Sequence, residues 1–109
     1  MIFDCRFLQN PYWDYQLRDL TGKHKLVSAY LSCDINWPNF LTKTVDLLSF
    51  LLPQYQASGK AYFQVGFGCS GGQHRSVFAA EEVASEIRKS GWKLKVDHRE
   101  LISAKMVCG

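Results

Sequence analysis

The sequence predicts a small three-layer α/β domain with a mainly parallel sheet, and three of its features lead to that class. An apolar stretch at residues 61–67 predicts a buried strand, and glycines follow it at once. Small and branched apolar residues then recur at helical spacing over residues 79–87, and residues 92–98 alternate like another strand. Strand, glycine loop, helix and strand in this order form a βαβ unit with parallel strands and a right-handed crossover.

The composition predicts one globular domain over residues 1–109, because a chain of this length holds a single core. Apolar residues make up 47% and charged residues 21%, which is typical of a folded protein. The formal net charge of +3 favours anionic ligands slightly and is small for a dedicated nucleic-acid binder.

The chain shows no membrane segment and no secretory signal. No apolar run reaches the roughly 18 residues that a spanning helix needs, and the first residues lack a basic segment followed by a long apolar stretch. The four cysteines are scattered, with no Cys-x-x-Cys pair. We therefore expect a cytoplasmic protein with reduced thiols, without a bound metal or cofactor.

The first strand and the loop after it come next in order. Residues 2–8 predict a strand in which Asp4 and Arg6 stand among apolar side chains, and Pro11 ends it because proline cannot donate to a ladder. Residues 12–22 have no clean apolar period and predict a long loop rich in polar and aromatic groups. A loop of that length in so small a domain is usually functional.

Helices account for much of the remaining chain. Residues 25–31 predict a short helix. Residues 41–55 carry apolar side chains at helical spacing after Pro38, and Pro53 should kink or end this second helix. The helix after the glycine loop should stop at Gly91, a residue type that favours helix ends.

The glycine loop at residues 68–76 predicts an anion site. Gly68, Gly71 and Gly72 allow sharp turns and close approach of a ligand, and the loop opens a helix whose free N–H groups favour an anion. Arg75 adds a planar fork that fits phosphate oxygens. A tight turn with glycines for packing alone is the alternative. A histidine and an arginine at a helix start oppose the dipole, however, and so favour a bound phosphate-sized dianion.

Cys69 raises an enzymatic alternative. The spacing from Cys69 to Arg75, followed by Ser76, resembles the Cys-x5-Arg phosphate loop of protein tyrosine phosphatases. That resemblance implies a thiolate nucleophile at Cys69 and a phosphoryl-holding Arg75. The alternative is a small residue that ends a strand. We favour the latter because the chain offers no evident general acid, so we assign no firm catalytic residue and expect no activity from this domain alone.

Four motifs occur along the chain in a fixed order, at residues 4–11, 17–22, 68–77 and 98–99. In this order they resemble the C-terminal domain of the RapZ/YvcJ family, bacterial RNase adapters and nucleotide-binding proteins. The resemblance implies a binding or sensory domain for a phosphorylated amino sugar or sugar nucleotide, such as glucosamine-6-phosphate, and implies homo-oligomers. The family's P-loop domain lies outside these motifs, so nucleotide hydrolysis is not carried over. The tail at residues 101–109 lacks the adapter's basic cluster, which leaves an RNA or protein partner with little support.

Several predicted ligand residues have a plain structural alternative. Asp4 and Arg6 either face the ligand or pair with each other or with Arg99, and Asn10 either shapes the loop or only makes a turn. The full set that we predict to bind the ligand is Asp4, Arg6, Asn10, Thr21, Gly22, Cys69, Ser70, Gly71, Gly72, Gln73, His74, Arg75, Ser76, His98 and Arg99. An exposed aromatic contact surface is expected among Tyr12, Trp13, Tyr15 and Trp37.

Overall fold

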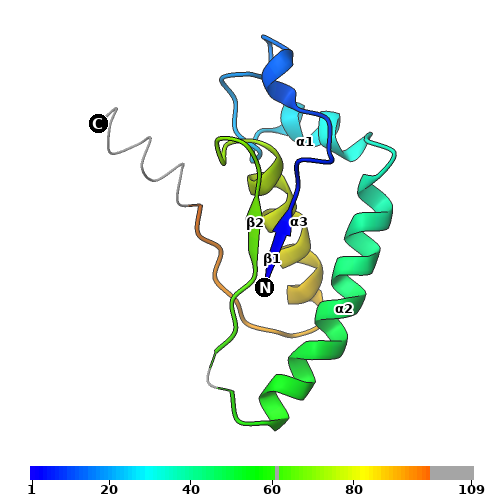
Figure 1. Cartoon of the computed structure of the whole chain (residues 1–109), viewed down its shortest axis with the longest axis vertical. Helices are drawn as coiled ribbons and strands as arrows, with labels where there is room; N and C mark the ends of the chain where they lie inside the picture. Colours follow the sequence, from blue (N-terminus) through cyan, green and yellow to red (C-terminus); the bar gives the residue numbers. More distant parts are fainter. Residues whose placement is uncertain (61, 99–109) are drawn as a thin grey trace, which may run out of the picture.

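The computed structural model describes residues 1–60 and 62–98 and shows a two-stranded sheet packed with three α-helices (Figure 1). The elements in chain order are β1 (Ile2–Asp4), the 3-10 helix η1 (Pro11–Trp13), α1 (Lys25–Ser32), α2 (Trp37–Ala57), β2 (Gly66–Gly68) and α3 (Arg75–Lys89). No helix within the described residues is both long and apolar enough to cross a membrane. The α/β class is confirmed.

The two strands run parallel, as predicted. Ile2 lies opposite Gly66 and Asp4 lies opposite Gly68. The first strand is shorter than expected, because the chain turns after Asp4 and the Leu8 N–H bonds the Cys5 carbonyl at 3.2 Å. Both strands therefore end at the same edge, where β2 leads into the glycine loop and α3 (Figure 1).

The strand expected at residues 92–98 does not form, and that prediction was wrong. Its alternation has another cause: Trp92 and Leu94 pack against the cluster that Leu48 of α2 forms with Val83 and Ile87 of α3. A strand needs a ladder partner as well as an alternating pattern, and this segment finds apolar contacts without one.

The helices largely follow the sequence pattern. α1 covers the predicted residues, and Gly91 ends the α3 region with a φ of +93°. α2 does not end at Pro53 but continues to Ala57. Packing of Leu48 and Leu52 on the α3 cluster accounts for this, because tertiary contacts can override a poor helix former.

The larger core cluster lies beneath the glycine loop and the loop before α1. It contains Cys5, Leu8, Leu17, Val27, Leu31, Trp37, Phe78 and Ala79. Trp37 is buried, with its ring centroid 4.5 Å from that of Phe78, so its expected exposure was wrong. Tyr12, Trp13 and Tyr15 are exposed as expected. This core fixes the start of α3 against the ends of the strands.

Candidate functional site

A hollow lies where both strands end, and we call it the strand-end hollow. Its volume is about 340 Å³, and it is lined by Ile2, Phe3, Asp4, Arg6, Gly68, Cys69 and Ser70. The parallel pairing of β1 and β2 brings Asp4, Arg6 and the glycine loop together, as the sequence predicted for strands of one direction.

The glycine loop turns on two left-handed residues. Gly71 has a φ of +80° and Gly72 a φ of +65°, torsions that side chains disfavour. A Cβ added at Gly71 would meet no atom within 4 Å, so the backbone torsion alone requires glycine there. Among the described residues, no protein group accepts a hydrogen bond from the backbone N–H of Ser70, Gly71 or Gln73. These donors remain available at the start of α3.

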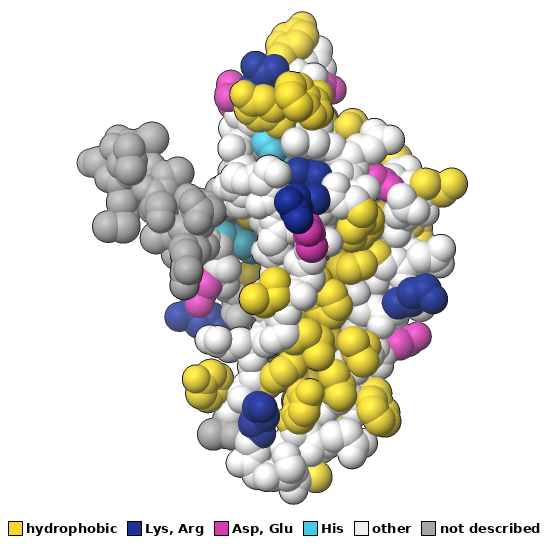
Figure 2. Space-filling model, in the orientation of Figure 1, with side chains coloured by type: hydrophobic (Ala, Val, Ile, Leu, Met, Phe, Trp, Pro, Cys, Tyr) yellow, Lys and Arg dark blue, Asp and Glu magenta, His cyan; other side chains and the backbone are white. Residues whose placement is uncertain are grey.

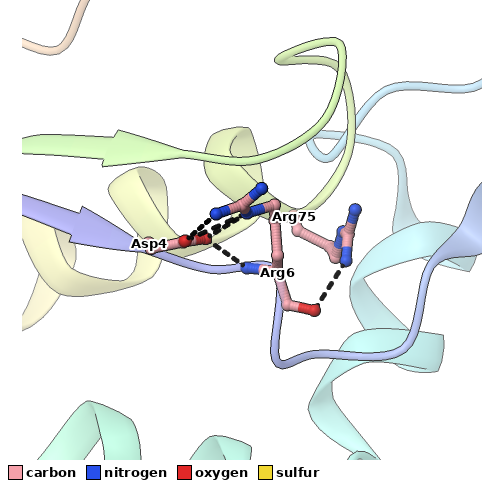
Figure 3. Close-up of polar contacts among 3 residues, drawn as sticks. All are labelled: Asp4, Arg6 and Arg75. Atoms are coloured by element: carbon pink, nitrogen blue, oxygen red, sulfur yellow. Dashed lines mark hydrogen bonds and ion pairs between the residues drawn. The ribbon is translucent and has the colours of Figure 1, made fainter.

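Asp4 and Arg6 form an exposed ion pair at the rim of the hollow. Arg6 Nη2 lies 2.6 Å from Asp4 Oδ2, and Arg6 Nε lies 3.0 Å from both carboxylate oxygens. Figure 3 shows the Arg6 side chain folded back over the end of β1 onto Asp4. Hydrogen bonds from Arg6 lower the pKa of Asp4 to about 2, and the same bonds raise the pKa of Arg6. Both groups stay charged near neutral pH, in contact with water.

Arg75 is buried, and its guanidinium group bonds backbone carbonyls of the chain itself. Its Nη1 donates to the Arg6 carbonyl at 3.0 Å (Figure 3). The same nitrogen also donates to the Leu8 carbonyl at 3.1 Å. These bonds hold the turn that follows β1 against the first residue of α3. The Arg75 charge also lowers the pKa of Asp4, so it adds positive potential beneath the hollow.

Cys69 lies half-buried in the wall of the hollow, and its sulfur faces Ser76. The Ser76 backbone N–H donates to Cys69 Sγ at 3.3 Å, and the Ser76 hydroxyl oxygen lies 3.3 Å from the same sulfur. Burial raises the pKa of the thiol. Hydrogen bonds from Ser76 and Gly72 and the Arg75 charge together outweigh that effect, so the pKa is lowered overall. The start of α3 therefore stabilises negative charge at this position.

Gln73 and His74 hold the long loop in place. Gln73 Nε2 donates to the carbonyls of Arg18 and Leu20, both at 2.8 Å. His74 Nε2 lies 3.1 Å from the Leu17 carbonyl and 3.0 Å from the Arg18 carbonyl. Two carbonyl neighbours make this nitrogen the protonated one. The side chains of Gln73 and His74 thus hold the long loop through its backbone carbonyls, and their predicted contact with a ligand stays a prediction.

Gly22 lets that loop approach α3 closely. A Cβ at Gly22 would clash with the His74 carbonyl oxygen and would lie 2.6 Å from the Phe78 nitrogen. The Gly22 N–H donates to the Gln73 carbonyl at 2.9 Å. Thr21 makes a local turn, in which its Oγ1 accepts from the Lys23 N–H at 3.2 Å. Gly22 therefore allows the long loop to pack closely against the start of α3.

Asn10 and His98, also predicted to bind the ligand, make hydrogen bonds within the protein. Asn10 caps η1, because its side-chain oxygen accepts a hydrogen bond from the Tyr12 N–H at 3.1 Å. This contact agrees with the alternative in which Asn10 makes a turn. His98 Nε2 lies 2.7 Å from Glu81 Oε1 on α3. Arg99 lies outside the described residues.

Sequence reasoning missed some residues of this region. Ile2 and Phe3 line the hollow, and the Phe3 ring stacks on Phe67 with centroids 5.5 Å apart. Arg18 donates from Nε to the Tyr12 carbonyl at 2.9 Å and lies over the Tyr12 ring. The position of Arg18 in the motif at residues 17–22 was the available signal. Its stacking partner Tyr12 is one of the aromatic residues that the sequence predicts to be exposed.

A second hollow lies at the opposite end of the strands, and we call it the N-terminal hollow. Its volume is about 480 Å³, and Met1, Lys60, Tyr62, Phe63 and Gln64 line it. The Lys60 ammonium lies 5.0 Å from the centroid of the Tyr55 ring. Within the part of the chain that the structure describes, neither a carboxylate side chain nor a glycine loop lines this hollow.

Comparison with known proteins identifies relatives over almost the whole chain. A family profile described as the RapZ C-terminal domain matches residues 1–102. A nucleotide-binding protein of Roseobacter denitrificans is 48% identical over 101 residues, which cover 93% of this chain and 34% of the relative. Nucleotide-binding proteins of Cereibacter sphaeroides (50% identity, 93% and 34% covered) and Zymomonas mobilis (46%, 93% and 31%) are similar over the same length. The chain spans about a third of the length of these curated relatives.

Proposed function

The chain belongs to the RapZ C-terminal domain family, and from that premise we propose that it binds a phosphorylated amino sugar or sugar nucleotide, of the glucosamine-6-phosphate kind, in the strand-end hollow. One observation carries the proposal. An exposed Asp4–Arg6 pair stands at the rim of a hollow whose other wall is a glycine loop with available N–H groups.

The phosphate belongs on the glycine loop. Backbone N–H groups at Ser70, Gly71 and Gln73 and the N-terminal end of α3 supply donors and positive potential for a dianion. Arg6 is exposed and flexible enough to turn from Asp4 to a phosphate oxygen, with which it forms a planar fork. Arg75 remains below and contributes charge without leaving its carbonyl partners.

The amino sugar belongs beside Asp4. Its carboxylate has a pKa of about 2 and is therefore ionised when the ligand arrives. A sugar with an ammonium group and a phosphate offers Asp4 a cation and Arg6 an anion. Such a ligand replaces one exposed ion pair with two. The description of the relatives as nucleotide-binding proteins supports the sugar nucleotide as the other member of the ligand class.

Calorimetric titration tests this proposal. We expect glucosamine-6-phosphate to bind more tightly than glucose-6-phosphate, and glucosamine alone to bind weakly. Arg6→Ala should weaken binding of the phosphorylated ligands roughly tenfold to a hundredfold, the usual effect of losing a charge-assisted hydrogen bond. Asp4→Asn should reduce the preference for the amino sugar.

Lys60→Ala is the matched control, because it removes a cation from the N-terminal hollow and should leave affinity unchanged. Equal affinity in wild type and Arg6→Ala, or no binding of any sugar phosphate or sugar nucleotide by the folded protein, would contradict the proposal.

A cysteine-dependent phosphatase is the second candidate, favoured by the lowered pKa of Cys69. Against it, Arg75 Nη1 is occupied by the Arg6 and Leu8 carbonyls, whereas phosphoryl transfer needs a free fork. We expect no hydrolysis of an aryl phosphate by the wild-type protein. Turnover that disappears in Cys69→Ser would make the phosphatase the primary function.

Self-association through the exposed aromatic tip completes the proposal. Tyr12, Trp13 and Tyr15 are 48%, 78% and 78% exposed, and Figure 2 shows hydrophobic side chains at this upper end of the molecule. Large exposed apolar groups usually mark contacts. Light scattering should show oligomers that Trp13→Ala dissociates, and a monomeric wild type at tens of micromolar would contradict this.

A further inference from the structure

We propose that Cys5 and Cys69 form an oxidisable pair, which a small hydroperoxide joins into a disulfide beneath the strand-end hollow. The proposal goes beyond ligand binding, because it assigns a modification site to two thiols that the proposed function does not use as reacting groups.

The strand register places the two cysteines opposite each other. Asp4 lies opposite Gly68, so the next residues along both chains are Cys5 and Cys69. The Cys5 N–H donates to the Gly68 carbonyl at 2.7 Å, which holds the two chains together at this point. Paired positions on neighbouring strands lie about 4.8 Å apart and direct side chains to the same face. That separation is within the range of about 4.4–6.8 Å that a disulfide spans between Cα atoms.

The two thiols differ in access. Cys69 lines the hollow and is half-buried, whereas Cys5 is fully buried in the core cluster. Burial raises the pKa of Cys5 to about 12, and the nearby Cys69 is the next cause of that rise, which is a second sign of their closeness. Cys69 is therefore the accessible thiol that a solvent-borne oxidant meets first, and its lowered pKa favours the thiolate form that reacts. Cys5 is the partner that resolves the product.

The chemistry needs only the peroxide. The Cys69 thiolate attacks one peroxide oxygen, the O–O bond breaks, and hydroxide leaves, so that Cys69 carries a sulfenic acid. The Cys5 sulfur then attacks the Cys69 sulfur and displaces the hydroxyl group, which leaves as water with the Cys5 proton. The two sulfurs lose two electrons together, and the peroxide gains them. The high pKa of Cys5 makes the second step the slower one.

Oxidation should also alter the glycine loop. A disulfide sulfur is a poorer acceptor than a thiolate, so oxidation should weaken the hydrogen bond that the Ser76 N–H donates to Cys69. A link to Cys5 also fixes the end of β2 to the end of β1. Reduced affinity for a sugar phosphate is the expected consequence, and this consequence alone rests on the proposed function.

Mass spectrometry of the full chain tests the pair directly. In a Cys33→Ala/Cys108→Ala variant, only Cys5 and Cys69 remain. Hydrogen peroxide should remove the mass of two hydrogen atoms from the monomer, dithiothreitol should restore it, and digestion under non-reducing conditions should yield one peptide pair joined through Cys5 and Cys69. The wild type should give the same pair.

Cys5→Ala on that background should stop at the sulfenic acid, which dimedone traps on Cys69. Sulfinic acid on Cys69 without a cross-link when Cys5 is present, or links only between molecules, would overturn the proposal. A cross-link in a protein that binds no sugar phosphate would refute the proposed function and leave this inference standing.

Discussion

The two hollows at opposite ends of the strand pair differ in chemistry more than in size. The N-terminal hollow is the larger, at about 480 Å³ against about 340 Å³, yet among the described residues that line it only Lys60 has a charged side chain, which lies over the Tyr55 ring. The strand-end hollow has an ion pair on its rim, a left-handed glycine pair in its wall and the start of α3 beside it. Volume alone therefore does not distinguish the two hollows as binding sites, whereas the direction of the parallel strands favours the strand-end hollow as the candidate site.

The two ends are also stabilised differently. At the N-terminal end, apolar contacts of α2, α3 and Trp92 form the smaller core cluster. At the strand end, side chains at the start of α3 bond backbone carbonyls of two loops: Gln73 and His74 hold the long loop, and Arg75 holds the turn after β1. The site thus depends on polar bonds from three consecutive residues, and substitutions there should have larger effects than matched ones at the other end.

The largest difference in lost stability is expected between alanine substitutions of two glycines, Gly22 and Gly59. Gly22→Ala places a methyl group against the His74 carbonyl and 2.9 Å from Val77 Cβ, and it should lower the free energy of unfolding by about 3 kcal/mol through overpacking. Gly59→Ala has open space at a φ of +82° and should cost about 1 kcal/mol from its torsion alone. Urea denaturation measures both, and equal losses would contradict the close packing at Gly22.

The next effect distinguishes the two arginines of the site. Arg75→Ala leaves one buried and one partly buried carbonyl oxygen without their donor and should lower the free energy of unfolding by about 2 kcal/mol. Arg6→Ala removes an exposed pair and should leave thermal stability nearly unchanged. Thermal denaturation of both variants is the measurement. A stable Arg75→Ala protein that merely loses ligand binding would show that Arg75 acts on the ligand and not on the turn.

The smallest effect concerns pH. The folded pKa of Asp4 is about 2, below its ordinary 3.8, so the folded state binds fewer protons at this site than the unfolded state. Its contribution to stability is complete above pH 3.8 and is lost as the pH falls toward 2. Asp4→Asn should therefore lower the melting temperature slightly above pH 3.8, where the wild type has this contribution, and the melting temperatures of the two proteins should converge as the pH falls toward 2. An identical acid profile in both proteins would show that the Asp4–Arg6 pair does not form in solution.

Much of the fold could be predicted because the spacing of apolar residues is a local property of the sequence. α1, α3 and the start of α2 follow it, and the glycine loop marks the end of β2. Residues 92–98 show the limit of this signal: the alternation of Trp92 and Leu94 reports burial on one side, but a ladder partner is a property of the whole fold. The continuation of α2 past Pro53 has the same origin in distant contacts.

The sequence could indicate where a candidate site lies, but it could not indicate which groups the side chains there contact. The sequence located Asp4, Arg6 and the glycine loop because strand ends and glycines are visible in it. It could not give the partners of Gln73, His74 and Arg75, because these are backbone carbonyls of remote loops and carbonyls have no sequence signature. From the sequence alone, basic residues at a helix start therefore predict ligand groups, and their carbonyl partners become visible only in the fold.

Backbone amide NMR during a titration with glucosamine-6-phosphate tests the central claim, that the ligand binds where the strands end. The account predicts that the amide signals of Ser70, Gly71 and Gln73 shift most and saturate together, with Arg6 Nε shifting beside them. Signals from the N-terminal hollow, at Lys60, Tyr62, Phe63 and Gln64, should stay in place. Shifts confined to those four residues, with the glycine loop unmoved at saturation, would contradict it.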